Sequence, residues 1–200
     1  TRRALRSVAA VEAAALAGWR AVREGGRVGL VAWGAGDPVV VTACGRDRGM
    51  VAVAGGLASA HAAALARASR GDPEEAEPTL AAALELARRL VPKGATVLAA
   101  SGFDAPALTF DAAVMALSRR TTIAALVVLD AFERHPPEGS FDYRAPDGRF
   151  GRGGAGTAFD PATDPRVARL ARLGVTTIPI GADEAPEAVA ARLEALDGRR

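Results

Sequence analysis

The sequence predicts an α/β fold, with a doubly wound, mostly parallel sheet and helices on both faces. The main observation is the run Ile123–Leu129, which is apolar without interruption and is followed by Asp130. Such a run is typical of a strand buried on both faces, as in a parallel sheet covered by two layers of helices. The second observation is that strand-like and helix-like segments alternate from Thr96 onward, which is typical of βαβ units.

Local patterns predict each element in turn. Apolar residues at helical spacing predict a long first helix over 3–24, closed by Gly25 and Gly26. Two short strands, separated by a turn-forming cluster, predict an antiparallel hairpin at the edge of the sheet. The elements after the first helix are strands over 27–33 and 39–42, helices over 51–68 and 79–90, a strand over 96–100, a helix over 106–119, a strand over 122–130, a helix over 165–173, a strand over 175–180 and a helix over 186–196.

Residues 1–200 are expected to form a single domain, since a chain of this length with 50% hydrophobic residues can bury a real core. Within it, 131–164 is a long insertion compared with ordinary strand-to-helix loops. The turn-forming residues 145–148 predict a β-hairpin in this insertion. The glycine-rich stretch 151–157 is expected to be a flexible arm.

Composition excludes several classes of function. The net charge is +2, the arginines are dispersed and only 4% of residues are aromatic, which does not favour nucleic-acid binding. Cys44 is the single cysteine, so no internal disulfide can form and a reducing compartment is expected. Because no apolar run approaches the ~20 residues that span a bilayer, we expect no membrane contact by this segment and a cytoplasmic location.

Familiar catalytic and metal-binding patterns do not fit the chain. The stretch 151–157 has no lysine for a phosphate-binding loop, and Ser101 lacks the glycine pattern of a nucleophile elbow. The two histidines, His61 and His135, do not have metal-ligand spacing. We therefore expect no catalytic residues and no resident cofactor.

The loops that leave the carboxyl ends of parallel strands form the functional edge of an open α/β sheet. Ser101 and Asp104 follow one predicted strand, and Asp130 and Glu133 follow the next. These side chains are therefore expected to converge. Their oxygens suit a hard cation such as magnesium, but acids at helix starts also cap free backbone amides, and the second role is the commoner one.

The order of motifs along nearly the whole chain resembles the bacterial domain of unknown function fifty-eight family. The motifs are the helix end and strand over 23–31, Ser101-Gly102-Phe103, the acidic turn over 129–134 with 136–139, the hairpin over 142–149 and the strand start over 173–175. The resemblance implies a core similar to a von Willebrand factor type A domain, which in many members carries a metal-ion-dependent adhesion site. It also implies association with MoxR-type AAA+ ATPases and, in many members, membrane-spanning segments ahead of this region, so the chain could be the cytoplasmic part of an anchored protein.

The chain departs from the family pattern where that metal site would lie. The adhesion site implied by the resemblance begins with Asp-x-Ser-x-Ser after a first strand, and the chain begins at Thr1, past that strand. Gly102 and Gly26 stand where members usually have aspartate. The resemblance places the first strand in the middle of the sheet, so we expect a longer amino end in the natural protein, or a segment of another chain, to fill that place.

The leading hypothesis is a non-catalytic interaction or adaptor domain that acts with a MoxR-type AAA+ ATPase. Its contacts would be the edge residues Ser101, Asp104, Asp130 and Glu133 and the hairpin aromatics Phe141, Tyr143 and Phe150, since aromatic side chains dominate interfaces. The alternative is a doubly wound enzyme that binds a phosphorylated small molecule at the same edge, with 151–157 as a lid.

Overall fold

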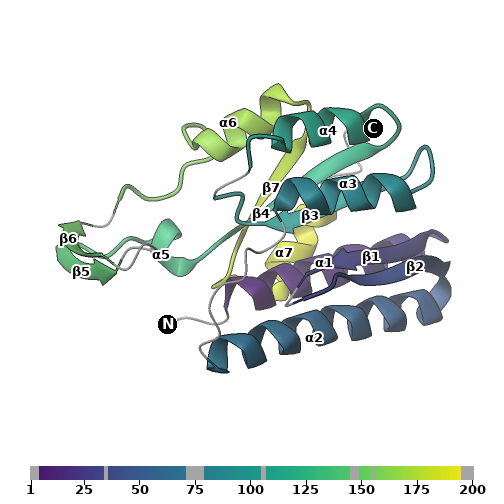
Figure 1. The fold of residues 1–200 in the computed structure, drawn as a ribbon, viewed down its shortest axis with the longest axis horizontal. Coiled ribbons are helices and arrows are strands. Elements are labelled where there is room, and N and C mark those ends of the chain that lie inside the picture. The colour runs from purple at the N-terminus through teal and green to yellow at the C-terminus, as the bar shows by residue number, and fades with distance from the viewer. Residues whose placement is uncertain are drawn as a thin grey trace.

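The computed structural model describes residues 5–33, 36–70, 79–104, 107–144, 149–154 and 156–194. The predicted α/β fold is confirmed: a parallel sheet lies between helices on its two faces (Figure 1). The elements are α1 (Arg6–Arg23), β1 (Arg27–Ala32), β2 (Val39–Gly45), α2 (Arg46–Arg70), α3 (Leu80–Leu90), β3 (Thr96–Ser101), α4 (Phe110–Ser118), β4 (Thr122–Leu129), α5 (Ala131–Arg134), β5 (Ser140–Arg144), β6 (Phe150–Gly154), α6 (Pro165–Arg172), β7 (Thr176–Gly181) and α7 (Pro186–Glu194).

The parallel sheet has the order β3-β4-β7, with β4 in the middle. Successive side chains of β4 point to opposite faces of the sheet, and all seven residues from Ile123 to Leu129 are buried. Ile123, Ala125, Val127 and Leu129 pack in the cluster that contains α3, α4 and α6, whereas Leu126 packs with α1 and α7. The uninterrupted apolar run thus has the cause predicted from the sequence, which is burial on both faces.

The strands β1 and β2 pair antiparallel as predicted, but they form a separate ribbon and not the edge of the parallel sheet. The apolar side chains Val28, Leu30 and Val41 of this ribbon pack on Met50, Val53 and Leu57 of α2. The described part of the chain therefore has one core around the parallel sheet and a smaller one beneath the ribbon, with α1 in contact with both sheets.

Helix α2 is longer than the helix predicted over 51–68, and its composition is more uniformly apolar than expected. By length and composition alone it could cross a membrane, because an 18-residue window has a mean hydropathy of 1.5. The sequence pattern does not identify this stretch as a long apolar run because many of its residues are alanine or glycine. In the structure α2 packs on β1, β2 and α1, and just over a quarter of that window is buried.

Other elements differ from the prediction in their bounds. Helix α4 begins at Phe110, later than the predicted start at 106, since 107–109 are not helical. The acidic turn after β4 forms the short helix α5, and α6 begins at Pro165 as predicted. The predicted flexible arm is wrong for Gly151–Gly154, because these residues form β6 and pair with β5. Backbone pairing needs no side chain, so the glycines do not prevent it. The predicted turn 145–148 and the acidic stretch 71–78 lie outside the described residues.

Candidate functional site

The four predicted edge residues lie where β3 and β4 end, and two of them share one arginine. The Nη1 atom of Arg166, in the first turn of α6, lies 2.9 Å from Asp104 Oδ1 and 2.8 Å from Glu133 Oε1. The same nitrogen donates to the carbonyl oxygen of Gly102. Asp104 follows β3 and Glu133 lies in α5, so Arg166 connects the loops that leave two neighbouring strands.

Asp130 and Ser101 have local structural roles at this edge. Asp130 caps α5: its carboxylate accepts from the backbone N–H of Glu133, and the Glu133 carboxylate accepts from the backbone N–H of Asp130. This reciprocal arrangement is a capping box. The Ser101 hydroxyl accepts from the backbone N–H of Phe103, which has a positive φ of 54°. Both residues shape the loops that carry Asp104 and Glu133.

A second arginine, Arg6 in the first turn of α1, reaches the same carboxylates. Its Nη2 lies 2.9 Å from Asp104 Oδ2 and its Nη1 lies 3.7 Å from Glu133 Oε2, while its Nε donates to the carbonyl oxygen of Val128. Gly102 makes this possible, since a Cβ built at Gly102 would collide with the Arg6 guanidinium. We call Arg6, Asp104, Glu133, Asp164 and Arg166 the edge ion-pair cluster.

Asp164 fixes the position of Arg166. Its carboxylate accepts from the backbone N–H groups of Arg166 and Val167, as an N-cap does, and from the Nε and Nη2 of Arg166. Burial raises the pKa of Asp164, but these hydrogen bonds outweigh burial and leave it below its ordinary value. For Arg166, burial lowers the pKa, but bonds to Asp164 and Glu133 outweigh it and the pKa rises. Asp164 and Arg166 are therefore both charged at neutral pH.

Acid should destabilise the protein through Asp164. A carboxyl whose pKa is lower in the folded than in the unfolded chain contributes stability above its unfolded pKa, about 3.9, and loses it as the pH falls through the folded pKa. We expect the melting temperature to drop on acidification, and Asp164→Asn to reduce the drop. Circular dichroism melts from about pH 7 to about pH 3 measure both. An identical pH profile for the variant would contradict this assignment.

The edge residues do not fit the cation that the family resemblance implies. Asp104 and Glu133, the carboxylates that face each other there, are both paired with arginine, so a cation would have to displace two guanidinium groups. Within the described residues, no group of three or more His, Cys, Asp or Glu side chains is arranged to hold a metal ion. The guanidinium groups of Arg6 and Arg166 thus supply these carboxylates with the positive charge that a bound cation would supply.

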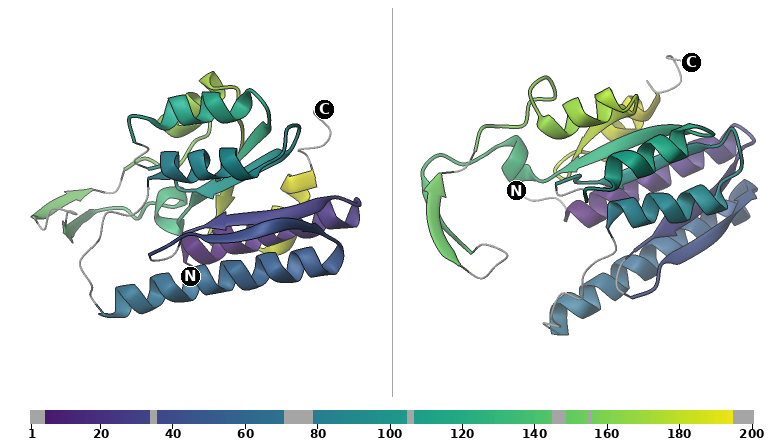
Figure 2. Two further views of the ribbon diagram at one scale, coloured as in Figure 1. Left: turned by 45° about the vertical axis from the view of Figure 1, so that its right-hand side comes forward. Right: turned by 45° about the horizontal axis from the view of Figure 1, so that its top comes forward.

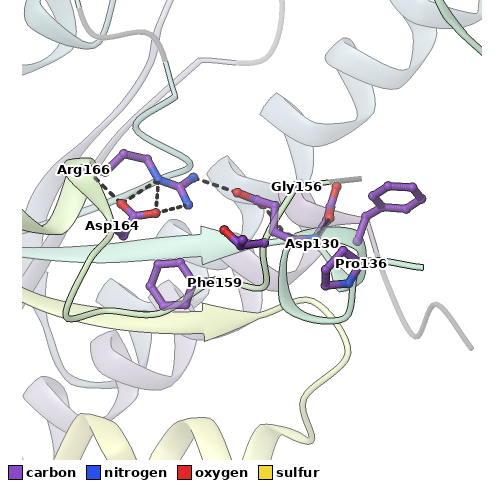
Figure 3. A pocket seen from close by; sticks show the side chains of 9 residues that line it. Asp130, Pro136, Gly156, Phe159, Asp164 and Arg166 are labelled. Atoms are coloured by element: carbon purple, nitrogen blue, oxygen red, sulfur yellow. Dashed lines mark hydrogen bonds and ion pairs between the residues drawn. The ribbon is translucent and has the colours of Figure 1, made fainter. Parts of the chain in front are cut away.

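A cavity of about 320 Å³ lies beside the cluster, between α5 and the stretch that leads into α6. Figure 3 shows Asp164 and Arg166 pointing toward each other at one end, with Phe159 nearby and Pro136 and Gly156 at the other end. The Arg166 guanidinium lies over the Phe159 ring at 5.8 Å. Three carboxylates line this cavity, and its one arginine is already paired with two of them, so the lining is unfavourable for a phosphate group.

The other end of α5 is also held by ion pairs. Arg134 lies 2.7 Å from Asp183 and 3.0 Å from Glu184, both in the loop between β7 and α7, and Arg192 of α7 also contacts Glu184. Burial raises the pKa of Asp183, but hydrogen bonds, including that from Arg134, hold it below its ordinary value. The short helix α5 is therefore tied to α6 on one side and to the β7–α7 loop on the other.

The predicted hairpin projects from the body of the molecule as the ribbon β5–β6 (Figures 1 and 2). Tyr143 is paired with Gly151, and residues that lie directly opposite in a ladder share a face, so Phe141 and Tyr143 lie on one face and Phe150 on the other. Phe141 packs edge-to-face on Phe132 of α5, with ring centroids 6.1 Å apart. The ring of Tyr143 covers Gly151, since a Cβ added at Gly151 would collide with that ring.

Residues 1–148 match the family model described as a protein of unknown function, DUF58. The chain belongs to this family. No curated protein matches the DUF58 chain. It is similar to the crystal structure of the conserved hypothetical protein BatB from Bacteroides thetaiotaomicron, with a TM-score of 0.55 and 16% identity over 94% of this chain and 88% of that chain. At this identity the likeness supports the fold alone.

Sequence reasoning found the acids of the DUF58 chain's edge but missed its arginines. Arg6 lies 98 residues from Asp104 in sequence, and Arg166 lies 33 from Glu133, so no local pattern connects them. One usable signal was present: Asp164 followed by Pro165 is a typical N-cap with proline at the first helical position. The hairpin aromatics were found, but their division between two faces emerged only from the strand register.

Proposed function

We propose that this DUF58 chain is a non-catalytic docking domain that binds a protein partner through the apolar face of its projecting ribbon. The observation that carries the proposal is the row formed by Phe132, Phe141 and Tyr143, which we call the ribbon patch. These residues are 44%, 37% and 56% exposed, although large aromatics are usually buried. Exposed aromatic clusters of this kind supply the anchor residues of protein interfaces.

The ion-pair clusters support a docking role because they hold the base of the ribbon in place. Glu133 and Arg134 of α5 are fixed to α6 and to the β7–α7 loop, and Phe132, from the same helix, supports Phe141. A patch held rigidly loses less conformational entropy on binding than a mobile one. The family resemblance suggests a MoxR-type AAA+ ATPase as the partner, and we adopt that as the partner to test.

Removing the Tyr143 ring should weaken partner binding at least tenfold, since interface aromatics are commonly worth more than about 1.4 kcal/mol. The matched control is Phe150→Ala. Phe150 is an aromatic of the same ribbon, 82% exposed, but on the opposite face beside Arg144. Binding of a purified MoxR-type ATPase to immobilised full chain should fall for Tyr143→Ala and change less than threefold for Phe150→Ala. Equal losses, or none, would overturn the proposed face.

The alternative function, an enzyme for a phosphorylated small molecule, has the cavity beside Arg166 in its favour. Its acidic lining argues against an anionic ligand. We therefore expect magnesium with ATP, and magnesium alone, to leave the melting temperature of the chain unchanged relative to chelator. A ligand at a hundred times its Kd would add about 2.7 kcal/mol, or roughly 5–10 °C for a chain of this size. A rise of that order would favour the enzyme and count against the docking proposal.

A further inference from the structure

The cavity of about 320 Å³ beside α5 carries an excess of negative charge (Figure 3). Its charged lining consists of three carboxylates and one guanidinium, which gives a formal charge of −2; these groups belong to Asp130, Glu133, Asp164 and Arg166. The two other members of the edge ion-pair cluster, Arg6 and Asp104, do not line the cavity and pair with each other, so they leave this balance unchanged. A cavity of this sign attracts a cationic ligand.

Asp130 is the carboxylate of this lining that has no cation beside it. Its Oδ1 accepts from the backbone N–H of Glu133, as the cap of α5. Among the described residues, no arginine, lysine or histidine forms an ion pair with Asp130, whereas Glu133 and Asp164 both contact Arg166. A carboxylate can accept several hydrogen bonds on its two oxygens. Asp130 therefore has capacity left for a donor that enters the cavity.

Two phenylalanine rings form apolar walls of the cavity, and one of them already binds a guanidinium. The guanidinium carbon of Arg166 lies 5.8 Å from the centroid of the Phe159 ring. The backbone N–H of Phe159 donates to the carbonyl oxygen of Glu133 at 2.7 Å, which holds this wall against α5. The second ring is that of Phe132. Aromatic faces attract guanidinium groups electrostatically, so rings and carboxylates together favour the same kind of ligand.

Phe132 belongs both to the cavity and to the ribbon patch. It lines the cavity, it is 44% exposed, and its ring packs edge-to-face on that of Phe141 in β5. A protein seated on the ribbon patch therefore has the cavity next to it. This continuity favours a side chain of the docked protein over a free small molecule as the occupant.

We propose that the cavity binds an arginine side chain of the protein that docks on the ribbon patch. The guanidinium contacts the Phe132 ring and donates to the Asp130 carboxylate. This inference rests on the proposed function, because the docked protein is the source of the arginine. It adds the chemistry of that partner, which presents an apolar contact to the patch and, beside it, an exposed arginine.

Two other cations fit the cavity less well than a guanidinium. A lysine ammonium is compact and strongly hydrated, and it cannot form the planar, two-point contact that arginine forms with a carboxylate. A divalent metal ion needs several oxygen ligands, but the carboxylates of Glu133 and Asp164 are already bonded to Arg166. A guanidinium needs only one free carboxylate and an aromatic face, and the cavity offers both.

Titration of the full chain with a blocked arginine, followed by NMR of the backbone amides, tests the proposal. The probe is Nα-acetyl-arginine methylamide, and the matched ligand is the citrulline analogue, which has nearly the same shape but no charge. The arginine probe should shift amides within 130–136 and 156–166, the segments that line the cavity. The citrulline analogue should bind about tenfold more weakly or worse, because it lacks the charge-assisted bond to the carboxylate.

Asp130→Asn is the matched variant of the chain. Asparagine caps helices about as well as aspartate, so α5 should be retained while the charge is lost. Binding of the arginine probe should weaken about tenfold. The control is Asp37→Asn, which changes the net charge equally at an exposed position outside the cavity lining and should alter binding less than about twofold. If the Asp130 variant failed to fold, the comparison of arginine with citrulline on the natural chain would still decide.

Several outcomes would overturn the proposal. One is the absence of shifts up to about 50 mM arginine probe, well above the roughly millimolar Kd expected for a ligand of this size. Equal binding of the lysine analogue would show that the cavity does not recognise a guanidinium. Shifts of the same amides by magnesium alone would make it a metal site.

The test is distinguishable from that of the ribbon patch. Loss of partner binding in Tyr143→Ala, together with no binding of the arginine probe, would refute the arginine site and leave the docking face intact. Binding of the probe at the cavity, with no effect of Tyr143→Ala on the partner, would support the arginine site and refute the docking face.

Discussion

Phe110→Ala should lower the free energy of unfolding by about 3–5 kcal/mol, the usual cost of removing a buried phenylalanine side chain. Phe110 is 1% exposed and lies at the start of α4, edge-to-face with Phe103 at 6.2 Å between ring centroids. The guanidinium carbon of Arg169 in α6 lies over the Phe110 ring, 5.3 Å from its centroid. The ring thus packs against both the loop that carries Asp104 and the helix that carries Arg166. Chemical denaturation followed by circular dichroism measures the change.

A matched control lies two residues away. Leu108 is fully exposed, so Leu108→Ala should change stability by less than about 0.5 kcal/mol. If Phe110→Ala cost no more than this control, the ring would not be part of the core and the packing of the loop over 102–104 would need another explanation.

Arg166→Leu should lower the free energy of unfolding by about 2–3 kcal/mol at neutral pH, less than for a fully buried pair because Asp104 is half-exposed. The substitution keeps the aliphatic bulk but leaves Asp104, Glu133 and Asp164 close together with only Arg6 to balance them. Since the pKa of Asp164 is held down mainly by bonds from Arg166, its pKa should rise in the variant.

The pH dependence distinguishes lost ion pairs from lost packing. The difference between wild type and Arg166→Leu should shrink as the pH falls toward the range in which carboxyls are protonated, because the unpaired charges disappear. Arg166→Lys should retain part of the stability, since lysine keeps the charge but cannot form the forked contact with Asp164. The control is Arg152→Leu, whose pair with Asp142 is largely exposed and should matter little. A pH-independent loss in Arg166→Leu would contradict the electrostatic account.

Most of the fold could be predicted because its elements are recorded in local patterns. The run Ile123–Leu129 identified the central parallel strand, and the helix predicted over 79–90 matches α3, which Thr79 caps by accepting from the backbone N–H of Ala82. The predicted bounds of the elements were wrong where one amino-acid composition suits more than one structure. Glycines at 151–154 suit a flexible arm as well as a strand, and only pairing with β5 decides between them.

The site was less predictable than the fold. The sequence placed Asp104 and Glu133 at one edge because strand order determines where loops meet, and that expectation is consistent with their shared contact to Arg166. It did not show what neutralises these acids. Arginines are spread through the chain, and which of them reaches an edge depends on helix packing over distances that no local pattern covers. The role of Gly102 in admitting Arg6 likewise required coordinates.

Tyr143 makes the ribbon observable by optical methods without an engineered label. It is the single tyrosine among 200 residues, and it is 56% exposed. The two tryptophans are Trp19 in α1 and Trp33 just after β1, both on the body of the molecule. A reagent that nitrates phenols would therefore place its nitro group on the ribbon, and a nitrated ring quenches tryptophan emission in a distance-dependent way. The chain thus contains its own donors and a single site for the acceptor, for following the ribbon relative to the body in real time.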